Sequence, residues 1–134
     1  MVAACSEQSS NEVARLTSPN GKSDVVLREG SAGATTSYRY DVFLVAKGIE
    51  TSQDGLVATL HGASRNPNAY GVGLRWEREE SIRMDYWQAQ EVVISRPQMR
   101  LGDAMVSVSV FGGVRDDSAP AGSMFYNLKP NSSK

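Results

Sequence analysis

Side chains that could do chemistry are few in this sequence, and their spacing does not assemble a familiar catalytic group. His61 is the only histidine and Cys5 the only cysteine among 134 residues. Without a second histidine, no histidine pair can hold a catalytic metal. His61 follows a short apolar run, and a histidine at a strand end is more often a hydrogen-bonded edge residue than a general base. Cys5 lies close to the chain end, where no fixed base could keep its thiolate ready to attack.

Acidic residues offer the other possible chemistry. Four of them gather in one short segment: Glu77, Glu79, Glu80 and Asp85. Glycosidases use two carboxyl groups about 5 to 10 Å apart to divide acid and base work. Here arginines alternate with the acids on an expected hairpin tip, which favours a solvated turn with ion pairs. Asp116 and Asp117 lack the alternating acids of a calcium loop. We therefore expect a protein that is not an enzyme, with no metal site and no cofactor.

Size and charge set further limits on function. Lysines and arginines number 14 and aspartates and glutamates 15, which gives a formal net charge of -1. No large field of one sign would draw the chain to a nucleic acid or to an anionic membrane surface. Its apolar runs, such as residues 42–46, are far shorter than the roughly 20 residues that cross a bilayer as a helix. The length is typical of one domain with its own core.

The N-terminal segment Met1-Val2-Ala3-Ala4-Cys5-Ser6 resembles the end of a bacterial lipoprotein signal. In such signals, small residues precede a cysteine that receives a diacylglycerol, and polar residues after it form a tether. The resemblance implies a lipidated Cys5, a tether over residues 1–12 and a location at the periplasmic face of the outer membrane. The charged and hydrophobic parts of a complete signal are missing, so we expect Met1 to replace them in a shortened chain. The alternative is a chance Ala-Ala-Cys at a frayed terminus.

Turn-forming residues recur at intervals of roughly 8 to 12 residues from Val13 onward, a spacing typical of antiparallel sheets. The strongest turn is Ser18-Pro19-Asn20-Gly21, in which the proline presets φ and Asn-Gly supplies positive φ. Strands are expected over residues 13–17, 23–29, 37–47, 56–61, 72–76, 81–87, 90–95 and 104–111, with Phe125 docking back on the body. The sequence thus predicts one all-β domain over residues 13–128, an antiparallel β-sandwich or partly open barrel of seven to eight strands. A frayed tail follows over 129–134.

Alternation within two of these strands predicts which faces are buried. One face of residues 37–47 is apolar throughout: Tyr38, Tyr40, Val42 and Leu44. The other face begins with charged residues and continues with apolar ones: Arg39, Asp41, Phe43 and Val45. A strand of this kind is covered on both sides at one end and solvated on one side at the other. In residues 104–111, valines alternate with serines, which predicts one wet face.

Two segments, Ser18-Pro19-Asn20-Gly21-Lys22 and Gly33-Ala34-Thr35-Thr36, resemble motifs of an uncharacterised family of small bacterial proteins, often lipoproteins. In that family the second segment opens a long strand, and a later tryptophan heads a hairpin like the one expected over residues 76–86. The resemblance covers residues 13–95 and implies the fold, but the family has no known activity. The tail after Phe111 departs from the pattern. Residues 33–36 lack the spacing and the following helix of a phosphate-binding loop.

A binding surface is the remaining possibility. Residues 62–71 form a long polar loop of a composition typical of adaptable binding loops. With the neighbouring hairpin, this loop carries the expected binding residues: Arg65, Asn66, Asn68, Tyr70, Trp76, Arg78 and Trp87. Arginine and aromatic side chains dominate binding hot spots because they join a large area to a directional polar group. The alternative for Trp76 and Tyr38 is a place in the core.

These expectations favour a lipid-anchored protein of the bacterial envelope that acts as a non-catalytic binding module. A specific version is an immunity or inhibitor protein that occludes the active site of a toxin. The competing classes are a structural or assembly subunit of an envelope or secretion complex, which adds an edge strand to a partner sheet, and, last, an envelope hydrolase. The expected partner is another envelope protein rather than a nucleic acid, the membrane is reached only through the lipid anchor, and the chain is expected to be a monomer.

Overall fold

The structure, a computed structural model, describes residues 10–31, 38–63, 71–102 and 104–113. This part of the chain forms nine strands and one short 3₁₀ turn, η2 (Gln53–Gly55). The strands are β1 (Ser10–Thr17), β2 (Ser23–Ser31), β3 (Tyr38–Ala46), β4 (Leu56–Ala63), β5 (Val72–Arg78), β6 (Ser81–Tyr86), β7 (Glu91–Ile94), β8 (Gln98–Leu101) and β9 (Ala104–Phe111). No helix in these ranges is long and apolar enough to cross a membrane.

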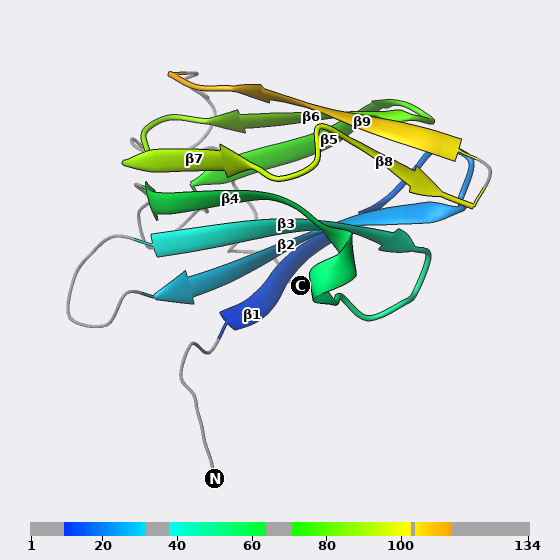
Figure 1. Cartoon of the computed structure of the whole chain (residues 1–134), viewed down its shortest axis with the longest axis horizontal. Helices are drawn as coiled ribbons and strands as arrows, with labels where there is room; N and C mark the ends of the chain where they lie inside the picture. Colours follow the sequence, from blue (N-terminus) through cyan, green and yellow to red (C-terminus); the bar gives the residue numbers. More distant parts are fainter. Residues whose placement is uncertain (1–9, 32–37, 64–70, 103, 114–134) are drawn as a thin grey trace, which may run out of the picture.

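The strands form two open sheets that pack face to face as a sandwich (Figure 1). One sheet has the order β1-β2-β3-β4-β7 and is antiparallel throughout, and the other has the order β5-β6-β9-β8. In this four-stranded sheet, β6 and β9 pair in parallel. The predicted all-β sandwich is therefore confirmed. The described strands exceed the predicted seven to eight because β8, which is only four residues long and directly follows Pro97, was not anticipated.

Strands β1 to β4 form a meander in which each strand pairs with the next. The predicted first turn is present: the Gly21 N–H donates to the Ser18 carbonyl at 2.8 Å, and Gly21 has a φ of 76°. Strand β4 extends further than expected. A bulge opposite β3 places Gly62 at a φ of 66° and carries the strand on to Ala63, so these two residues, expected in a loop, belong to a strand.

The core lies between the sheets and is built from alternate residues of each strand. The inner face of β3 contributes Tyr40, Val42 and Leu44, all fully buried. Ile82 and Met84 of β6 and Val106 of β9 face them from the other sheet. The predicted wet face of β9 is confirmed as well, since Val106 and Val108 are buried while Ser109 is exposed.

A second, smaller apolar cluster lies on the outer face of the five-stranded sheet. It consists of Val26, Phe43 and Val45, with Leu56 packed against it. The polar residues at the other end of the same face of β3 are less buried: the Arg39 and Asp41 side chains are 35% and 13% exposed. This difference confirms the prediction that β3 is covered on both sides at one end only.

The two sheets are linked along both sides of the sandwich. On one side the chain passes from β7 in one sheet to β8 in the other, and the N–H groups of Ser95 and Arg96 both donate to the Val57 carbonyl, at 2.9 and 3.1 Å. On the opposite side, the Trp76 indole N–H of β5 donates to the Leu16 carbonyl of β1 at 2.8 Å. This bond joins the edge strands of the two sheets.

Candidate binding groove

The predicted site residues fall into two groups. Cys5 and the loop residues Arg65, Asn66, Asn68 and Tyr70 lie outside the described residues. The structure places the other three on or just after the β5–β6 hairpin: Trp76, Arg78 and Trp87.

Trp76 is half-buried and packs against the core, which matches the alternative that the sequence left open for it. Its indole N–H is engaged with Leu16, so its role in the fold is explained without a partner. Arg78 is exposed at the hairpin turn, and Trp87 is half-buried just after β6. Arg78 lines a shallow pocket with Glu79 and Ser107, and neither tryptophan contributes to that pocket.

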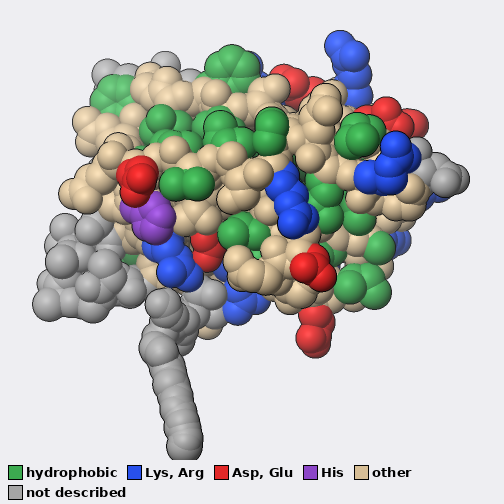
Figure 2. Space-filling model, viewed as in Figure 1, with side chains coloured by type: hydrophobic (Ala, Val, Ile, Leu, Met, Phe, Trp, Pro, Cys, Tyr) green, Lys and Arg blue, Asp and Glu red, His purple; other side chains and the backbone are tan. Residues whose placement is uncertain are grey.

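The acids of the hairpin and the histidine are also placed. The predicted turn is present, with Glu79 and Glu80 exposed at its tip, and Arg83 forms an ion pair with Asp85 at 2.8 Å. His61 is exposed on β4 opposite Glu91 of β7 (Figure 2). Within the described ranges, no three His, Cys, Asp or Glu side chains lie together as a metal site would require.

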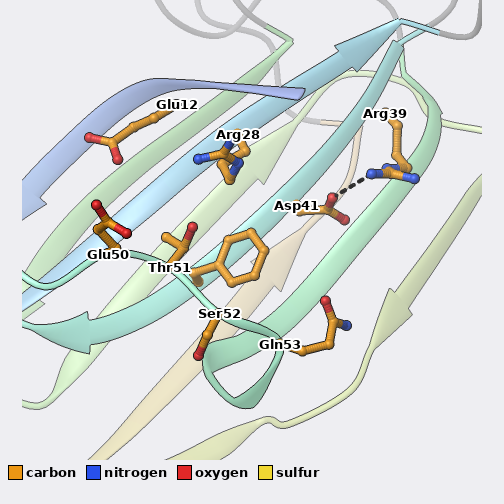
Figure 3. A pocket seen from close by; sticks show the side chains of 9 residues that line it. Glu12, Arg28, Arg39, Asp41, Glu50, Thr51, Ser52 and Gln53 are labelled. Carbon is orange, nitrogen blue, oxygen red and sulfur yellow. Dashed lines mark ion pairs between the residues drawn. The ribbon is translucent and has the colours of Figure 1, made fainter. Parts of the chain in front are cut away.

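The structure instead presents a groove on the outer face of the five-stranded sheet (Figure 3). Its volume is about 590 Å³, and it opens to solvent along its length. The residues that line it, called here the groove residues, are Glu12, Arg28, Arg39, Asp41, Phe43, Glu50, Thr51, Ser52 and Gln53. The first five are on strands β1 to β3 and form its floor, whereas the last four precede or begin η2 and form its wall.

Charges of alternating sign cross the floor of the groove. Strand register places Glu12 of β1 opposite Arg28 of β2, and Arg28 opposite Asp41 of β3. Opposite charges that face each other across neighbouring strands stabilise a sheet, by about 0.2 to 1 kcal/mol for each pair. The row continues to Thr59 of β4, whose hydroxyl donates to the Asp41 carboxylate at 2.7 Å.

Asp41 is the centre of this floor. Arg39 forms an ion pair with it at 3.0 Å from one side, and the Thr59 hydroxyl donates to its other oxygen. Because Thr59 is buried, this hydrogen bond fixes the carboxylate on the sheet. The floor is therefore a preorganised set of charges and not a flexible surface.

The wall differs from the floor because its polar side chains have no hydrogen-bond partner within the described residues. Glu50, Ser52 and Gln53 are exposed, and Thr51 is half-buried. Ser52 precedes η2 without capping it, since its side chain makes no hydrogen bond to the turn. The wall thus presents a carboxylate, two hydroxyl groups and an amide along one side of the groove.

A charge network outside the groove holds this wall against the sheet. The buried Asp24 carboxylate accepts hydrogen bonds from the Gly48 N–H at 3.0 Å, the Thr17 hydroxyl at 2.7 Å and Arg15 at 2.9 Å. Arg15 also donates to the Ile49 carbonyl at 3.1 Å. The residues directly before Glu50 are thereby pinned at two backbone positions.

The network shifts the protonation of its acids. Burial works to raise the pKa of Asp24, but the hydrogen bonds from Gly48, Thr17 and Arg15, together with the Arg15 charge, hold that pKa below its ordinary value. Hydrogen bonds from Arg15 likewise lower the pKa of Glu12, at the rim of the groove. Both acids therefore stay ionised at neutral pH.

Sequence reasoning missed the groove, although it located part of it. The alternation of β3 placed Arg39 and Asp41 on a solvated face, but only strand pairing brings Glu12 and Arg28 beside them. The turn at residues 18–21 fixes the register of the β1–β2 hairpin as far as Ala14 and Leu27, but a register shift between Glu12 and Ala14 brings Glu12 opposite Arg28, and no local pattern signals that shift.

Comparison of the chain with protein-family models, with curated proteins and with solved structures finds no match.

Proposed function

We propose that the chain is a non-enzymatic binding module of the bacterial envelope, anchored through Cys5, and that the groove holds a polar segment of a partner protein. The observation that carries the proposal is the pairing of an ion-paired floor with a wall of unengaged hydrogen-bonding groups. A partner can satisfy the wall without disrupting the floor. An immunity or inhibitor protein is the specific form of this function that we favour.

The shape of the groove favours a protein segment over a small metabolite. Small-molecule sites are concave and mostly apolar, and they bury most of the ligand surface. This groove is open and polar, and its one aromatic side chain, Phe43, is only 7% exposed. An extended segment that carries both charges and amides matches such a lining, since it can pair with Glu50 while its backbone meets the hydroxyl groups of the wall.

A second candidate function is an assembly subunit that pairs through an edge strand. Strand β7 is at the edge of its sheet, and Val93 and Ile94 on it are 39% and 43% exposed. Figure 2 shows hydrophobic side chains in a band across this side of the sandwich. Natural proteins normally protect such edges with charged residues or a covering element. Addition of a partner strand to β7 would cover these side chains.

Site-directed photo-crosslinking in cells tests the groove. A photoreactive residue in place of Gln53 should give a protein adduct, and the adduct should be lost when Glu50→Lys is added. The same photoreactive residue in place of Glu79, at the exposed hairpin tip, is the matched control. Adduct formation from both positions alike, or from neither, contradicts the groove; an adduct from Val93 alone supports the edge-strand candidate.

The anchor is tested separately. When the chain is expressed behind a complete lipoprotein leader, it should incorporate labelled fatty acid and partition into detergent, whereas a Cys5→Ser form should stay in the aqueous phase. Labelling that survives the substitution contradicts the anchor but leaves the groove untouched. The proposal also implies no peptidoglycan, ester or phosphate hydrolysis, and an activity that His61→Ala abolishes would overturn this part of it.

A further inference from the structure

The outer face of the four-stranded sheet carries an unusual pair of like charges. In the antiparallel pairing of β5 with β6, Arg75 lies directly opposite Arg83. On the other side of β6, Arg83 is opposite Ser109 of β9, which is also exposed. Residues that face each other across antiparallel strands have Cβ atoms about 4.5 to 5.5 Å apart, and like charges at this distance destabilise a sheet. The fold itself gains nothing from this pairing.

The two arginines differ in their surroundings. Arg83 forms an ion pair with Asp85 at 2.8 Å, and its guanidinium carbon lies 4.2 Å from the centre of the Phe111 ring. Arg75 is exposed and makes no ion pair or hydrogen bond within the described part of the chain, not even with Glu77, two residues further along β5. One guanidinium is thus held in place by its neighbours, while the second is left without a counter-charge.

Phe111 adds an apolar surface to this charge pair. It is 43% exposed, although it is one of the larger apolar side chains of the described residues, and it lies at the end of β9 opposite Asp85. Arginine and aromatic residues are enriched in protein interfaces, in which a desolvated anchor lies beside a polar contact. The face therefore combines two positive groups with an apolar contact point.

We propose that Arg75 and Arg83 form a carboxylate-binding site, at which an acidic segment of a protein partner docks with an apolar side chain against Phe111. A carboxylate that reaches both guanidinium groups would give Arg75 the counter-charge that it lacks and would add a charge-assisted hydrogen bond at Arg83. The unpaired charge of Arg75 disfavours a basic partner, and the Phe111 ring beside Arg83 favours a peptide over a free inorganic anion. The placement of Arg75 opposite Arg83 thus destabilises the sheet and at the same time creates the binding site.

This site goes beyond the groove, because the two lie on opposite outer faces of the sandwich (Figure 1). A chain with both sites can hold two partners, or two parts of one partner, at the same time. The two sites are also independent in a test, since Glu50 belongs to the groove alone and Arg75 to the second site alone.

The test is a titration of the full chain, isotope-labelled and followed by NMR, with the peptide acetyl-Glu-Leu-Glu-amide. We expect the signals of Arg75, Arg83 and Phe111 to shift together. Arg75→Gln should weaken the affinity at least about tenfold, while Lys47→Gln, which removes an exposed positive charge just after β3 in the other sheet, should leave it unaltered. Phe111→Ala should weaken binding of this peptide but not of acetyl-Glu-Gly-Glu-amide. Glu50→Lys should change nothing, so a failure of the groove does not count against this site.

A thermal melt adds a readout that a purely structural arginine would not give. Because Arg75→Gln removes a like-charge pair, it should raise the melting temperature by about 2 °C, and added salt should reduce the difference. Equal affinity of Arg75→Gln and the wild type, or equal binding of acetyl-Lys-Leu-Lys-amide, overturns the proposal. Tighter binding of inorganic phosphate than of the acidic peptide overturns the choice of a protein segment. A lower melting temperature of Arg75→Gln overturns the repulsion on which the argument rests.

Discussion

The buried Asp24 carboxylate is the best point at which to test how the wall of the groove is held. Its side chain is 1% exposed, and it receives three hydrogen bonds from two separate segments: two from β1, through Thr17 and Arg15, and one from the backbone at Gly48. Asp24→Ala removes both acceptor oxygens and with them all three hydrogen bonds. Asp24→Asn keeps the shape of the side chain and one acceptor oxygen but removes the charge.

The expected loss of stability follows from the exposure of the three groups that donate hydrogen bonds to Asp24. Thr17 and Gly48 are exposed and Arg15 is 25% exposed, so water can replace part of each lost bond. At about 1 kcal/mol for each hydrogen bond, Asp24→Ala should lower the free energy of unfolding by about 3 kcal/mol, and Asp24→Asn by about 2 kcal/mol. Glu12→Gln is the matched control, because it breaks the more exposed ion pair of the same arginine and should cost less than about 1 kcal/mol.

Urea unfolding followed by tryptophan fluorescence measures these differences, and pH supplies a second test. The folded state lowers the pKa of Asp24 below its ordinary value of 3.8, so its stabilisation is fully present above that value and is lost as the pH falls through the folded pKa. The gap between the wild type and Asp24→Asn should therefore shrink in acid. A gap below about 0.5 kcal/mol at pH 7, within the usual range of inconsequential surface substitutions, would refute the reasoning, and so would a gap that stays constant down to the acid limit.

Four further substitutions test the fold. Val42→Asp and Val108→Asp each bury a charge in the core and should lower the free energy of unfolding by roughly 3 kcal/mol or more; wild-type stability of either variant in urea would mean that its face is exposed. Trp76→Phe keeps the ring against the core but loses the hydrogen bond to Leu16, and should cost about 1 kcal/mol, with faster amide exchange at the joined edges of the sheets. Gly112→Ala places a methyl group 2.3 Å from the hydroxyl of a tyrosine on β6 and should lower the melting temperature measurably, an effect that truncation of the tyrosine should relieve.

The parts of the fold that local patterns determine could be predicted. Alternation in β3 gave the face that enters the core, and it also gave the change from solvated to covered along the opposite face. The turn at residues 18–21 was predictable because proline and Asn-Gly restrict the backbone directly. Each of these features depends on residues that are close in sequence.

The remaining features depend on pairing between distant segments. The charge row from Glu12 to Asp41 depends on how β1 pairs with β2 and how β2 pairs with β3. The pair of Arg75 and Arg83 depends likewise on the register of the β5–β6 hairpin. Strand β8 has only four residues, and its two apolar side chains, Met99 and Leu101, are too short a run for periodicity to detect. No local sequence pattern indicates the parallel pairing of β6 with β9.

That parallel pair has a consequence for the order in which the molecule folds. Ser81 pairs with Ser107, yet between them the chain leaves the sheet, forms β7 in the other layer and returns through β8. Parallel neighbours always require such a crossover, and the cost of closing a long loop is incurred before the contacts form. The meander β1 to β4 needs only local hairpins and can assemble early, whereas β9 can pair with β6 only when the long connection through β7 and β8 closes. A chain stalled before this step would expose the unpaired edge of β6, so the folding protein is most vulnerable to aggregation and proteolysis just before β9 pairs.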